Sequence, residues 1–265
     1  MAQNSDHTGD RPTFFDFAAK VGLTKHYGSL AATEELIELC HIGEGKYILD
    51  VGCGVGVTPC FLVKRFGCKV VGVDISEGMI ESSKERASRE GMTDRIEFWV
   101  ADVQDLPFND DLFDAVISES VTSFPEDKQR AVNEYVRVTK PGGYVGLNES
   151  TWLKTPPPQE IISWASQDLG AHVKPLTSDG WSELLESAGL KEIVVKTYDL
   201  HVQEEVKGII RRYGYGGMLR CIYKALSLYS RSKDYRRFVK DVRSKGVKPD
   251  NLEEYMGYGI YVGKK

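Results

Sequence analysis

Several features that would narrow the class of this 265-residue protein are missing from its sequence. There is no run of about 18 apolar residues, so no segment is predicted to span a bilayer. The polar beginning lacks the apolar stretch of a secretion signal, which predicts a cytoplasmic protein. An excess of basic charge is also missing: 34 basic residues face 39 acidic ones, for a formal net charge of −5. Nucleic acid is therefore not an expected partner.

Cysteine is scarce as well, with five residues. An odd number without a secretion signal favours free thiols in a reducing compartment. Three of them lie close together in the sequence but lack the Cys-x2-Cys spacing of a zinc site, so we expect no metal. The five are Cys40, Cys53, Cys60, Cys68 and Cys221.

What the sequence does contain is an alternation of strand-like and helix-like segments. With short links, such an alternation implies parallel strands joined by right-handed crossovers, and therefore an α/β fold. The predicted strands are 46–52, 69–76, 95–103, 113–120 and 143–151, with helices at 58–67, 76–91 and 127–143. Beyond them we expect helices at 159–169 and 177–190, strands at 191–200 and 255–265, and a mostly helical segment at 201–254.

The first predicted strand runs into Asp50, and glycines follow at alternate positions, Gly52, Gly54 and Gly56. A glycine-rich turn between a strand and a helix lets backbone approach a nucleotide-like ligand, because no Cβ stands in the way. In open α/β sheets such ligands lie at the carboxyl ends of the strands. A dinucleotide-binding turn would read G-x-G-x-x-G, whereas here the third glycine comes one residue early.

The next two predicted strands also end in aspartates. Asp74 can accept hydrogen bonds from both hydroxyls of a ribose, although a lone aspartate in this position is more often a helix cap. Asp102 begins the most specific stretch, ADVQDLPFNDDLFDAVIS at 101–118. That stretch combines a strand-end aspartate, a Leu-Pro-Phe loop and a Phe-Asp pair opening the fourth strand.

Taken together, residues 47–150 resemble the class I S-adenosylmethionine (SAM) methyltransferases. The resemblance implies a Rossmann-like, mostly parallel sheet with helices on both faces, a C-terminal antiparallel hairpin and a helical insertion before the last strand. It also implies SAM as the cofactor, S-adenosyl-L-homocysteine as the product and no metal. The single predicted domain, 1–265, divides into a helical cover (12–45), a SAM-binding core (46–150), an acceptor side (151–200), a basic insertion (201–254) and a last strand (255–265).

The resemblance also implies roles for single residues. Asp50 and the three glycines would surround the methionine part of SAM, and Asp74 would bind the ribose. Asp102 would accept from the adenine amino group, and the Val103 backbone would contact the ring. The full predicted cofactor set is Tyr27, Asp50, Gly52, Gly54, Gly56, Asp74, Ile75, Asp102, Val103 and Glu119.

Candidates for the methyl-transfer step lie at two places. Glu119 ends the fourth strand and could bind SAM, act as a base or hold a cationic acceptor, with a capping or solvent-facing carboxylate as the alternative. Tyr27 resembles a tyrosine of a helix that closes over SAM, with ordinary packing as the alternative. His26 beside it is a candidate base, with a surface histidine as the alternative. Trp152 is a candidate for the acceptor pocket, with core packing as the alternative.

The insertion at 201–254 differs in charge from the rest of the protein. It has 13 bases and 7 acids, a formal excess of +6, which leaves −11 for the remainder. Tyr213 and Tyr215 are among the tyrosines interleaved with the bases. Three interpretations are open: a solvated basic face, a lid that packs these tyrosines around the acceptor, and a membrane-surface helix. Peripheral membrane contact is not the favoured one.

The predicted function is transfer of a methyl group from SAM to a small-molecule acceptor held in line with the sulfonium methyl. One alternative is a quinone or lipid methyltransferase at a membrane surface, and another is a non-catalytic SAM-binding regulator. A nicotinamide-dependent dehydrogenase would need the G-x-G-x-x-G turn. We expect a monomer or homodimer. The sequence of residues 151–254 does not indicate which acceptor is used, or whether a nitrogen, oxygen, sulfur or carbon atom is methylated.

Overall fold

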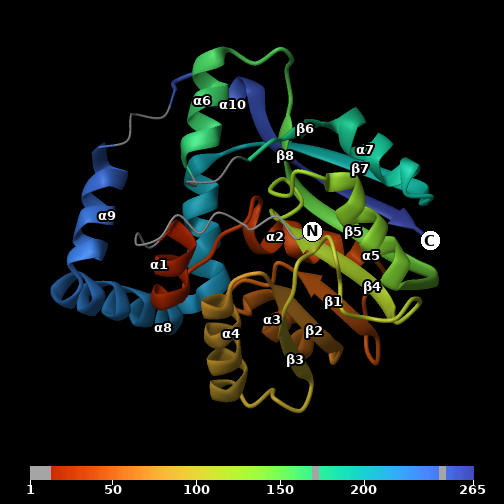
Figure 1. Ribbon diagram of the computed structural model, residues 1–265, viewed down its shortest axis with the longest axis horizontal. Helices are drawn as coiled ribbons and strands as arrows, with labels where there is room; N and C mark the ends of the chain where they lie inside the picture. Colours follow the sequence, from red (N-terminus) through yellow and green to blue (C-terminus); the bar gives the residue numbers. More distant parts are fainter. Residues whose placement is uncertain (1–12, 169–172, 245–248) are drawn as a thin grey trace, which may run out of the picture.

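The computed structural model describes residues 13–168, 173–244 and 249–265 (Figure 1). Its centre is a sheet with the strand order β3-β2-β1-β4-β5-β8-β7, and β6 pairs with β5 beside this path. The strands are β1 (Tyr47–Val51), β2 (Lys69–Asp74), β3 (Ile96–Val100), β4 (Phe113–Glu119), β5 (Thr139–Trp152), β6 (Leu176–Thr177), β7 (Lys191–Asp199) and β8 (Met256–Lys264).

Helices cover both faces of this sheet, because every central strand is apolar on both sides. The core on one face is built with α2, α3 and α4, and the core on the other with α5 and α7. The helices are α1 (Phe14–Val21), α2 (Ser29–Leu39), α3 (Val57–Phe66), α4 (Glu77–Arg89), α5 (Lys128–Val138), α6 (Gln159–Asp168), α7 (Ser178–Ser187), α8 (Val202–Arg231), α9 (Lys233–Ser244) and α10 (Leu252–Tyr255).

The register brings the carboxyl ends of the central strands together. β1 is parallel to both β2 and β4, with Val51 paired with Val73 on one side and Ser118 on the other. β8 pairs antiparallel with β5 and with β7. The predicted mostly parallel α/β sheet with an antiparallel hairpin at its end is therefore confirmed.

The predicted boundary between the helix at 127–143 and the strand at 143–151 is wrong. The helix expected over 127–143 ends at Val138, and β5 begins directly at Thr139. Thr139 pairs with Phe113 at the start of β4, and a shift of register follows before the regular pairing resumes. This irregular start accommodates Pro141, which cannot donate a ladder hydrogen bond.

The insertion forms α8, α9 and α10. In Figure 1, the first half of α8 descends below α6, and its second half then runs to the lower left below α1, where α9 rises from its end. The change of direction falls at Gly214, whose backbone is non-helical, with φ 65° and ψ 165°. α9 packs Phe238 against Phe14 and Phe17 of α1, with the Phe17 ring centroid 4.7 Å away.

Candidate active site

The glycine turn between β1 and α3 lies at the carboxyl edge of the sheet. Gly52, Gly54 and Gly56 have φ of 69°, 52° and 75°, in the left-handed region that glycine adopts readily. A Cβ at Gly52 would also collide with the side chain of Val121, which follows β4. The backbone N–H of Gly54 donates to Asp74 Oδ2 at 3.0 Å, so the turn is tied to the end of β2.

Asp74 is not the cap of the following helix. Ser76 takes that place in α4, since its hydroxyl accepts from the backbone N–H of Met79. Each Asp74 oxygen accepts one backbone hydrogen bond, from Gly54 or from Ser76, and retains a lone pair for a further donor. Burial raises the pKa of Asp74, and the two backbone bonds oppose that rise. The ribose contact stays a prediction.

Ile75 follows Asp74 and is 72% exposed, which is unusual for a residue at the end of a buried strand. It offers an uncovered apolar surface next to the glycine turn, as a platform for a flat ring requires. Further along the same edge, Asp102 Oδ1 accepts from the backbone N–H of Gln104 at 2.9 Å, and the Val103 side chain is buried. The adenine contacts predicted for these residues stay predictions.

The surroundings of Asp50 show whether a positively charged group of a ligand fits beside the glycine turn. It is only 2% exposed, and its Oδ2 has no hydrogen-bond partner among the residues that the structure describes. Burial, followed by the nearby Glu119 charge, raises its pKa well above the usual value. A buried acceptor without a donor is costly, so an ammonium group at this position would satisfy it. The residues present therefore fit the amino group of SAM.

Glu119 and His26 lie together in a buried polar cluster. The Glu119 carboxylate accepts from the hydroxyls of Thr33 and Thr58 at 2.8 and 2.9 Å, and it lies 3.2 Å from His26 Nε2. His26 Nδ1 is 3.0 Å from the carbonyl oxygen of Tyr27. His26 is 6% exposed, so the alternative of a surface histidine is wrong.

The charges in this cluster follow from its burial and its neighbours. Burial, assisted by the positive charge of Arg212, lowers the pKa of His26 to about 4 despite the opposing effect of Glu119. For Glu119, burial raises the pKa, but His26, Arg212 and the threonine hydroxyls together lower it. We assign a neutral imidazole beside an ionised carboxylate at neutral pH, because burial is the largest effect on the histidine.

Arg212 is the site residue that the sequence did not single out. Its Nη2 donates to Thr58 Oγ1 at 3.0 Å, which brings the basic insertion to the start of α3. The adjacent Arg211 is exposed. The two residues carry the same charge. They differ only in orientation on α8, which turns Arg212 toward the site and Arg211 toward solvent.

Tyr27 and Trp152 meet in one apolar cluster. Both side chains pack against one buried cluster, which includes Ile161 of α6 and Met256 at the start of β8. The backbone of Tyr27 is fixed separately: its N–H donates to Ser120 Oγ at 3.3 Å, and its carbonyl accepts from Asn148 Nδ2 at 2.8 Å. The two predicted residues thus share one wall beyond β4 and β5, and their contacts with SAM or acceptor stay predictions.

The two tyrosines predicted for the acceptor lie elsewhere. The Tyr213 hydroxyl accepts from the backbone N–H of Thr24 at 2.8 Å and donates to its carbonyl at 2.9 Å, and Arg86 lies over the ring. Tyr213 therefore fastens α8 to the segment between α1 and α2. Tyr215 is 83% exposed. These placements do not support the predicted acceptor contacts.

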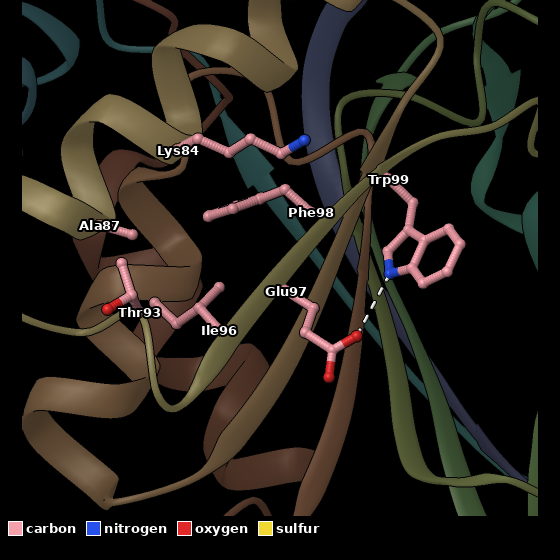
Figure 2. A pocket seen from close by; sticks show the side chains of 7 residues that line it. All are labelled: Lys84, Ala87, Thr93, Ile96, Glu97, Phe98 and Trp99. Carbon is pink, nitrogen blue, oxygen red and sulfur yellow. Dashed lines mark hydrogen bonds between the residues drawn. The ribbon is translucent and has the colours of Figure 1, made fainter.

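A separate cavity of about 310 Å³ lies at the outer edge of the sheet, between α4 and β3 (Figure 2). Trp99 and Phe98 point to opposite sides of β3 there, and Trp99 Nε1 donates to Glu97 Oε2 at 3.4 Å. The lining contains none of the predicted site residues: it consists of Lys84, Ala87, Thr93, Ile96, Glu97, Phe98 and Trp99. Within the described part of the protein, no group of three or more His, Cys, Asp or Glu is arranged to hold a metal ion.

Comparisons with known proteins agree with this arrangement. Residues 49–147 match the family described as a methyltransferase domain. An uncharacterised protein of Haemophilus influenzae is 31% identical over 226 residues, which are 84% of this chain and 89% of that protein. Phosphoethanolamine N-methyltransferase 3 of Arabidopsis thaliana is 29% identical over 170 residues, 64% of this chain but only 34% of the plant protein.

A solved structure extends the likeness to nearly the whole chain. Phosphoethanolamine N-methyltransferase 2 of Haemonchus contortus, with phosphomonomethylethanolamine and S-adenosylhomocysteine, superposes with a TM-score of 0.68. The identity is 19%, and the match covers 95% of this chain and 56% of that one, so this likeness concerns the fold. The chain belongs to the class I SAM-dependent methyltransferases. It is a methyltransferase whose cofactor is SAM.

Proposed function

We propose that this methyltransferase acts on a small-molecule acceptor. The observation that carries the proposal is the burial of the site: His26, Asp50, Thr58 and Glu119 are each no more than 9% exposed. Residues before β1 and residues of α8 complete this enclosure, through His26, Thr33 and Arg212. A macromolecular acceptor would need an open approach to the reacting atom. The relatives that are named for phosphoethanolamine, itself a small molecule, support the same choice.

In this proposal the residues of the sheet edge hold the cofactor. Asp50 accepts from the amino group, Asp74 accepts from the ribose hydroxyls, and Ile75 lies against the adenine. When bound, SAM supplies an electrophilic methyl group on a sulfonium. The remaining task of the protein is to place the acceptor and to exclude water.

His26 and Glu119 are the proposed groups for handling a proton. A neutral, buried imidazole can accept a proton from an acceptor that must lose one, and the adjacent carboxylate stabilises the charge that develops. An acceptor that reacts as a free amine or thiolate needs no such base, and Glu119 would then position the cofactor. The atom that receives the methyl group decides between these two roles.

The proposal is tested by incubating the intact protein with methyl-labelled SAM and a fractionated metabolite extract. We expect label in a low-molecular-weight product, which mass spectrometry then identifies. The matched control is Glu119→Gln, which keeps the shape of the side chain and removes its charge. Tight binding of SAM without any labelled product would instead show a non-catalytic SAM-binding protein, and label in protein or nucleic acid would contradict a small-molecule acceptor.

A further inference from the structure

The second half of α8, from Tyr215 to Arg231, carries an apolar face that the described structure leaves about half exposed or more. Five side chains on it follow one another at intervals of four, three, four and three residues, so they lie along one side of the helix. Each is between 46% and 83% exposed, as is one further tyrosine beside them. The six residues are Tyr215, Leu219, Ile222, Tyr223, Leu226 and Tyr229. We refer to these six residues as the α8 apolar face.

The opposite side of the same half-helix is already occupied. Cys221 is buried, and its thiol lies 3.5 Å from the carbonyl oxygen of Gly22, at the end of α1. Because α1 and the segment after it hold that side, the apolar face is directed outward. The exposure is therefore a consequence of how α8 is fastened, and the face is large compared with the scattered apolar residues of an ordinary surface.

The charged residues on the part of the helix that carries this face are all basic. Residues 206–233 contain seven bases and no acid, whereas the whole protein carries −5. Arg220 and Arg231 are exposed on the flank of the helix, and Lys224 lies 3.7 Å from Glu85 of α4. An apolar helical face rich in leucine and tyrosine and bordered by bases is the composition of a helix that lies in the surface of an anionic bilayer.

We propose that the α8 apolar face docks on an anionic lipid surface. Pairing with a second copy of this protein is disfavoured, because it would oppose two acid-free basic helices. Nucleic acid is disfavoured because Leu219, Ile222 and Leu226 offer aliphatic surface, which does not stack on bases. The docking is peripheral: among the described helices, none is long and apolar enough to cross a membrane.

The test is co-sedimentation of the intact protein with phosphatidylcholine vesicles, with and without phosphatidylglycerol. We expect binding to the anionic vesicles that weakens as salt is raised, because the Lys and Arg attraction is screened. Leu226→Asp should weaken binding about tenfold or more, the effect of withdrawing one leucine from apolar surroundings. The matched control is Val195→Asp, the same type of change at an exposed apolar residue of β7, and it should bind as the unaltered protein does.

Three results would overturn the proposal. The first is failure of the unaltered protein to bind anionic vesicles, which needs no variant to interpret. The second is equal binding by Leu226→Asp and the control, with both shown to be folded by circular dichroism. The third is evidence for another occupant of the face. A second copy would be indicated if the unaltered protein is dimeric by light scattering and Leu226→Asp makes it monomeric. Nucleic acid would be indicated if the unaltered protein binds a single-stranded RNA oligonucleotide but no vesicle.

Discussion

The buried neutral imidazole of His26 makes a definite prediction about stability in acid. An unfolded chain protonates this histidine near its ordinary pKa of 6.5, whereas burial lowers the folded-state pKa to about 4. Between these values the unfolded state binds more protons, so the free energy of unfolding falls as pH falls through this window. From about pH 7 to about pH 5, the two pKa values give a loss of about 2 kcal/mol from this residue.

The assay is urea unfolding followed by circular dichroism at several pH values, for the unaltered protein and for His26→Gln. Comparison of the two proteins isolates His26, because other buried groups such as Asp50 titrate in both. Glu119 has a pKa below its usual value of 4.5, so its stabilising contribution is lost only as pH falls below about 4.5, outside the range from pH 7 to pH 5. We expect the variant to lose about 2 kcal/mol less than the unaltered protein. His201→Gln, at an exposed histidine, is the control, and equal losses in all three proteins would refute the reasoning.

Three further predictions concern the cofactor site. Asp74→Ala should weaken SAM binding by about 1–3 kcal/mol, the scale of hydrogen bonds to a charged group, and an unchanged dissociation constant in calorimetry would remove its ribose role. Gly52→Ala should lower the free energy of unfolding by more than about 1 kcal/mol, because a side chain there is strained at positive φ and meets Val121; urea unfolding would show it, and an unchanged midpoint would contradict it. Arg212→Ala should raise the pKa of His26 in an NMR titration, and Arg211→Ala should leave that pKa unaltered. The same His26 pKa in both variants would show that Arg212 does not act on His26.

The core of the fold could be predicted because its signals are local. The glycine turn, the aspartates that end the strands and the cap at Ser76 are each written within a few residues of sequence. The signal that ends α5 is not local in this sense. Thr139 leaves the helix because it pairs with Phe113, a residue 26 positions earlier, and helical periodicity does not report such a partner.

The site residues likewise divide into those that local sequence predicts and those that depend on distant parts of the sequence. Asp50 and Asp74 were found from strand ends, since parallel strands carry their carboxyl ends to one edge. Arg212 reaches the site from a helix more than 150 residues after Thr58, and its neighbour Arg211 has the same charge. The burial of His26 likewise depends on Glu119 and Thr33, which are distant in sequence from one another.

Hydrogen exchange with and without SAM tests the central claim most directly, because it shows which backbone segments the cofactor covers. The account predicts slower exchange at the three segments of the sheet edge, residues 52–56, 74–76 and 102–104, with the rest of the sheet little changed. Slower exchange confined to the separate cavity beside β3, or no change at any of the three segments at saturating SAM, would contradict it.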